Sequence, residues 1–84
     1  MPQQTFEDVL IGEIRAELGR QDVTQKELAR RLGWEPSAIS KRFHRKVPIR
    51  AHEIEMIAEA LGVSVTQLGW PFDGRSIRSI RRAS

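Results

Sequence analysis

The stretch from Thr24 to Arg45 constrains the fold most, because its residues predict two short helices joined by a tight turn. Glu27 follows Thr24 at the spacing of a capping box, which marks the beginning of a helix. Gly33 supplies the left-handed residue that ends a helix, and Pro36 favours the first turn of the next one. Two short helices separated in this way are typical of a helix-turn-helix.

Apolar residues at helical spacing predict further helices on both sides of this pair. A helix over 6–19 should begin after the N-cap Thr5 and end at Gly19. The second helix of the central pair should cover 36–44. A fourth helix should run from about Ala51 to Gly62, and a short fifth helix should cover 65–69. The pattern predicts an all-α fold.

Length and composition exclude several classes of protein. A chain of 84 residues supports one small domain with a modest core. The chain has no cysteine, so disulfides and thiolate metal sites are excluded. No apolar run approaches the roughly 18 residues that cross a bilayer, and the N-terminus does not resemble a signal peptide. We therefore expect a soluble, cytoplasmic protein that does not bind membranes.

The net charge of +3 is distributed unevenly along the chain. Residues 24–50 carry eight lysines and arginines against two glutamates, whereas the segments on both sides, 1–23 and 51–70, are acidic. This asymmetry favours one basic surface that faces a polyanion. An ordinary solvated charged surface explains the charge alone equally well.

Three sequence motifs together carry a resemblance to a known family. They are TQxELAxxLG at 24–33, SxISK at 37–41 and IAxALGVS at 57–64. This combination resembles the Xre, or lambda repressor-like, family of DNA-binding domains over about residues 8–70. The resemblance implies a compact five-helix bundle that contains a helix-turn-helix. Residues 1–70 would then form the DNA-binding domain, and residues 71–84 a basic, flexible tail.

The resemblance also implies a division of labour on double-stranded DNA, with the helix over 36–44 in the major groove. The residues expected to read bases are Pro36, Ser37, Ser40, Lys41 and Arg42. The residues expected to bind phosphates are Thr24, Gln25, Arg15, His44, Arg45 and Lys46.

Two positions depart from the family pattern. Pro36 replaces a side chain that commonly contacts bases, which reduces direct readout. Phe43 replaces a glutamate that commonly pairs with an arginine of the first helix, which should leave Arg15 available for phosphate.

The interpretation that follows is a sequence-specific transcriptional regulator, a repressor of the phage or prokaryotic kind. The alternative is an antitoxin-like or other module whose main partner is a protein. Catalysis is not expected, because His44 and His52 do not form a metal-binding pair and Glu53 and Glu55 point to different faces of a helix. We expect no metal, no cofactor and no small-molecule ligand.

Two further predictions concern the C-terminal part of the chain. The arginines Arg75, Arg78, Arg81 and Arg82 could follow phosphates or enter a narrow minor groove. A disordered, solvated end explains them equally well. A homodimer on DNA is expected, and its candidate surface comprises Leu68, Trp70 and Phe72.

Overall fold

The computed structural model of the protein describes residues 5–69. Over this range it contains four α-helices and one 3-10 helix, and no strand. They are α1 (Phe6–Gln21), α2 (Gln25–Leu32), α3 (Pro36–Phe43), α4 (Ala51–Leu61) and η1 (Val65–Leu68). The all-α prediction is confirmed. The predicted fifth helix is one 3-10 turn, capped by Ser64 at its start and by Gly69 at its end.

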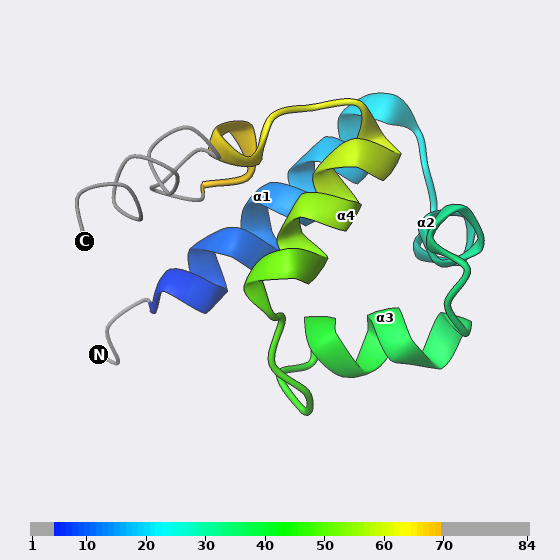
Figure 1. Ribbon diagram of the computed structural model, residues 1–84, viewed down its shortest axis with the longest axis horizontal. Helices are drawn as coiled ribbons and strands as arrows, with labels where there is room; N and C mark the ends of the chain where they lie inside the picture. The colour runs from blue at the N-terminus through cyan, green and yellow to red at the C-terminus, as the bar shows by residue number, and fades with distance from the viewer. Residues whose placement is uncertain (1–4, 70–84) are drawn as a thin grey trace, which may run out of the picture.

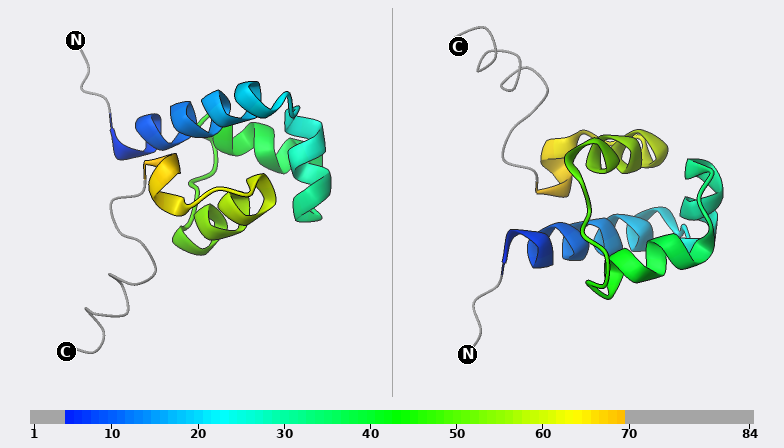
Figure 2. Two further views of the ribbon diagram at one scale, coloured as in Figure 1. Left: turned by 90° about the horizontal axis from the view of Figure 1, so that it is seen from above. Right: turned by 60° about the horizontal axis from the view of Figure 1, so that its bottom comes forward.

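The helices surround a single core (Figure 1). Helix α2 packs against both α3 and α4, while η1 packs against α1 and α4. The two views of Figure 2 show η1 beside α1 and α4, with α2 at the opposite end of α1 and α3 running back along α1 from there. The central helix pair therefore lies on one side of a base built from α1, α4 and η1.

Every element contributes buried apolar side chains to this core. The buried residues are Leu10, Ile11, Ile14, Leu18, Leu28, Ala29, Ile39, Phe43, Ile54, Ile57, Ala58, Leu61 and Leu68. They recur at helical spacing, as the sequence predicts. In α1 the buried apolar side begins at Leu10, because Phe6 and Val9 are 44% and 37% exposed.

Helix α1 ends later than its sequence predicts. Gly19 lies inside the helix, and the left-handed residue that ends it is Asp22, with φ of 56°. The Asp22 N–H donates to the Gly19 carbonyl, and the Val23 N–H donates to the Leu18 carbonyl over 2.8 Å. Aspartate tolerates this conformation, and Val23 then packs against the core. The helix therefore continues past Gly19 and ends where Val23 turns toward the core.

The N-terminal caps of α1 and α2 differ from each other. Thr5 and Asp8 form a reciprocal capping box at the start of α1. At α2 the Thr24 hydroxyl accepts from the Glu27 N–H over 3.0 Å, as predicted. The Glu27 carboxylate does not complete a box, because it pairs instead with arginines of its own helix. The predicted capping box is therefore half formed.

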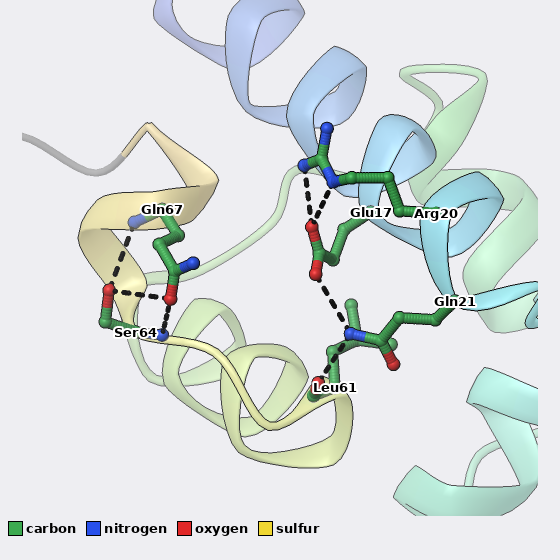
Figure 3. Close-up of polar contacts among 6 residues, drawn as sticks. All are labelled: Glu17, Arg20, Gln21, Leu61, Ser64 and Gln67. Atoms are coloured by element: carbon green, nitrogen blue, oxygen red, sulfur yellow. Dashed lines mark hydrogen bonds and ion pairs between the residues drawn. The ribbon is translucent and has the colours of Figure 1, made fainter.

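A polar contact joins the C-terminal ends of α1 and α4 (Figure 3). The Gln21 side-chain amide donates to the Leu61 carbonyl over 2.7 Å and to the Glu17 carboxylate over 3.0 Å. Arg20 pairs with the same carboxylate. The Gln21 and Arg20 hydrogen bonds lower the pKa of Glu17, so it stays ionised near neutral pH. Gln21 thus satisfies a carbonyl at the end of α4 that has no intrahelical partner.

None of the helices within residues 5–69 is long and apolar enough to cross a membrane.

Candidate nucleic-acid interface

The turn between α2 and α3 is built from backbone hydrogen bonds around Gly33. Gly33 has φ of 73°, and its N–H donates to the Arg30 carbonyl over 3.1 Å. The Trp34 N–H donates to the Ala29 carbonyl over 2.9 Å. Pro36 then occupies the first turn of α3, where its missing N–H has no consequence. The predicted helix-turn-helix geometry is confirmed, and α3 ends one residue before the predicted 44.

The core side of α3 is separated from a small, polar outer side. Ile39 and Phe43 are buried, at 1% and 4% exposure. Pro36, Ser37 and Lys41 are exposed, and Ser40 is half-buried. Small side chains on the outer side let a helix approach base edges closely.

Arg42 is half-buried and points sideways, toward α4. Its guanidinium forms a bidentate ion pair with Glu53, with nitrogen–oxygen distances of 3.2 and 2.8 Å. It also donates to the Ala38 carbonyl over 2.8 Å and lies 4.6 Å from the centre of the Trp34 ring. The side chain is 16% exposed. These hydrogen bonds use Nε and one N–H of each terminal nitrogen of Arg42, and base reading by Arg42 stays a prediction.

Trp34 fills the space at the turn, as its apolar character predicts. It is half-buried and packs against the core cluster. The Arg42 guanidinium lies over the Trp34 ring in a cation–π contact. The sequence spacing did not indicate this contact. Together with Thr24, Lys26, Glu27, Arg30 and Pro36, Trp34 lines an open depression of about 360 Å³ beside the turn.

Arg45, which is expected to bind phosphate, contacts α1 in the structure. It forms ion pairs with Glu7, over 2.8 Å, and with Asp8. Glu7 also accepts from the Ile49 N–H over 3.2 Å, so the first turn of α1 holds the loop between α3 and α4 at two points. Hydrogen bonds from the Thr5 backbone and side chain, and then the nearby Arg45, lower the pKa of Asp8.

Arg15 is exposed, and the family resemblance predicts that it has no partner on α3. The structure shows that it does contact α3. Its guanidinium carbon lies 5.1 Å from the centre of the Phe43 ring. The commonly observed acid–base pair between the first and third helices is replaced here by a cation–π contact. Arg15 forms no ion pair within residues 5–69 and keeps its charge available to an outside partner.

The remaining predicted phosphate-binding residues lie at the surface. Gln25 is half-buried at the first position of α2, and Lys46 is exposed in the loop after α3. His44 is exposed, and its Nδ1 lies 2.9 Å from the Ser40 carbonyl, to which it donates. In the part of the chain that the structure describes, Lys26, Lys41, Lys46 and Arg50 form no ion pair.

The structure also bears on the predicted dimer surface. Leu68 is fully buried in the core of the protomer, with 0% exposure, so it cannot form part of that surface. η1 brings it inward because its C-terminal end packs between α1 and α4. Trp70 and Phe72, like the four arginines of the predicted tail, lie outside the described residues.

Comparison with known proteins identifies related folds. The hypothetical transcription factor NHTF from Neisseria is 27% identical, with a TM-score of 0.72, and the match covers 95% of this chain and 91% of that one. The clp gene regulator ClgR from C. glutamicum shares the fold, at 21% identity and a TM-score of 0.71, over 79% of this chain and 86% of that one. No curated protein sequence matches the chain. The helix-turn-helix family model matches residues 14–68, most of the four-helix domain described above. The chain therefore belongs to the Xre, or lambda repressor-like, helix-turn-helix family of DNA-binding transcription regulators.

Proposed function

We propose that the protein is a sequence-specific repressor that binds double-stranded DNA and reads the major groove with α3. The observation that carries this proposal is the outer side of α3, where Ser37 and Lys41 are exposed beside a turn fixed by Gly33. Lys41 can donate to guanine O6 or N7, and serine hydroxyls can donate or accept. Ser40 and Pro36 complete the surface that faces the bases.

The phosphate contacts come from residues around this surface. Gln25 and the cap residue Thr24 lie at the N-terminal end of α2, where backbone N–H groups and the helix dipole favour an anion. His44 and Lys46 follow α3, and Arg15 lies over the Phe43 ring. Arg45 is left out of this set, and Arg42 out of the base-facing set, because Glu7 and Asp8 pair with Arg45 and Glu53 pairs with Arg42.

The proposal also includes a basic C-terminal segment and a homodimer on DNA. The domain comprises residues 1–70, and the basic segment 71–84 adds phosphate contacts through its arginines. Operators read by such domains commonly have two half-sites about 34 Å apart, which requires a homodimer on DNA. Deletion of residues 75–84 should lower affinity and flatten its dependence on salt. Unchanged binding would show that the segment makes no contact.

Selection of bound sites from random duplexes, followed by affinity measurements, tests the proposal. Lys41→Ala should change which sequences are preferred, because it removes a base contact. Gln25→Ala should weaken binding to all duplexes alike, because phosphate contacts carry no sequence information. A Lys41→Ala variant with unchanged affinity and preference would contradict the role of α3. The absence of binding to any duplex at low salt would contradict DNA binding and favour a protein partner.

A further inference from the structure

Helix α3 is held by few apolar contacts. It has eight residues, and only Ile39 and Phe43 are buried. Among the described elements, α3 packs most extensively against α2. A further contact is therefore needed to fix the angle between α3 and the rest of the domain.

The Arg42–Glu53 pair supplies that contact. It joins the last turn of α3 to the first turn of α4, and both side chains are largely buried, at 16% and 9% exposure. The two parallel hydrogen bonds fix the relative angle of the helices as well as their separation. Burial keeps salt from screening the pair.

Both partners are held in place by further contacts. Arg42 is fixed by the Ala38 carbonyl below it and by the Trp34 ring beside it. Glu53 accepts from the Arg50 N–H over 2.9 Å, which ties it to the backbone at the start of α4. The pair therefore connects the turn before α3, α3 itself and the start of α4.

Building on the proposed function, we propose that Arg42 and Glu53 are positioning residues that set the angle of α3, and thereby the ability of the protein to discriminate between DNA sequences. A buried ion pair often adds little net stability, and its better-attested use is to specify one arrangement. Base contacts need donor–acceptor distances of about 2.7–3.2 Å. A small rotation of α3 breaks them, while contacts to phosphate adjust through flexible side chains.

The alternative, in which Arg42 itself contacts bases, predicts the opposite effect of removing the Glu53 charge. If Arg42 contacted bases, removal of the Glu53 charge would release its guanidinium and sharpen sequence preference. If the pair positions α3, the same change blurs that preference. Glu53→Gln is therefore the decisive variant, because glutamine keeps the shape and an oxygen acceptor for the Arg50 N–H.

The experiment compares the affinity for a duplex selected by the wild-type protein with the affinity for an unrelated duplex, at one salt concentration. We expect Glu53→Gln to lower this affinity ratio about tenfold, the size of a coupling between neighbouring residues. Arg42→Lys keeps the charge but loses the bidentate geometry, and should lower the ratio in the same direction. If the buried charge of Arg42 unfolds the Glu53→Gln variant, Glu53→Asp carries the test, because it keeps the charge but is too short to hold the bidentate pair; a lower ratio supports positioning, whereas base reading by Arg42 predicts an unchanged or higher one.

Matched controls come from the pair within α2. Glu27→Gln removes the same charge, and Arg30→Lys makes the same substitution, in an exposed pair that does not bridge two helices. Glu27→Gln should raise affinity for both duplexes and leave their ratio unchanged. An unchanged or higher ratio in folded Glu53→Gln and Arg42→Lys would overturn this inference alone. Wild-type protein that bound no duplex would overturn the proposed function and this inference with it.

Discussion

Replacement of Gly19 by alanine distinguishes the observed end of α1 from the one that its sequence predicts. In the structure Gly19 lies inside the helix, and a Cβ built there has no atom within 4 Å. Alanine at such a position should stabilise the domain by roughly 0.5–1 kcal/mol, because glycine loses more backbone entropy on folding. For a domain of this size, each 1 kcal/mol shifts Tm by roughly 4–8 °C.

Gly33→Ala is the matched opposite case. A Cβ at Gly33 also has no atom within 4 Å, but φ is +73°. The absence of a clash means that the cost is conformational, roughly 1–2 kcal/mol for a residue with a side chain in the left-handed region. We therefore expect Gly33→Ala to lower Tm while Gly19→Ala raises it.

Thermal and urea unfolding followed by circular dichroism measures both changes. Gly12→Ala serves as the control for Gly19→Ala, because Gly12 lies near the middle of α1 and its added Cβ also meets no atom within 4 Å. A fall in Tm for Gly19→Ala together with a rise for Gly12→Ala would refute the reasoning. It would mean that Gly19 adopts the left-handed conformation and that α1 ends there.

Three further predictions concern the interactions that hold the helices together. The hydrogen bonds and charge of Arg42 lower the pKa of Glu53. The contribution of the pair to stability should therefore be complete above 4.5, the ordinary pKa of Glu53, and should decline as the pH falls below that value. Acid unfolding of Glu53→Gln should lack this decline. Gln21→Ala should cost roughly 1 kcal/mol in urea unfolding, because it removes the bond to the Leu61 carbonyl, and an unchanged midpoint would contradict that contact. Leu28→Ala should cost roughly 2–5 kcal/mol, because Leu28 is fully buried, and a loss below about 1 kcal/mol would contradict its place in the core.

The helices and the turn could be predicted from the sequence, because they depend on interactions between near neighbours. Thr24 caps α2, Gly33 ends it and Pro36 begins α3, all within a few residues of one another. The spacing of Ile39 and Phe43 likewise indicates which side of α3 is buried. The outer side that carries Ser37 and Lys41 follows from that spacing, so most of the predicted base-facing surface could be placed before the fold was known.

Which cations remain available to a partner could not be predicted from the sequence, because it depends on how the helices pack. Arg42 meets Glu53 from the following helix, Arg45 meets Glu7 from the first helix, and Lys41 meets no acid within residues 5–69. These three residues look alike in sequence, because each is a basic residue in or after α3. The acids that pair with Arg42 and Arg45 lie 11 and 38 residues away along the chain. Local sequence patterns do not show which residues so far apart come into contact. Ion pairs depend on where the helices pack, so the fold was needed to separate the paired Arg42 and Arg45 from Lys41.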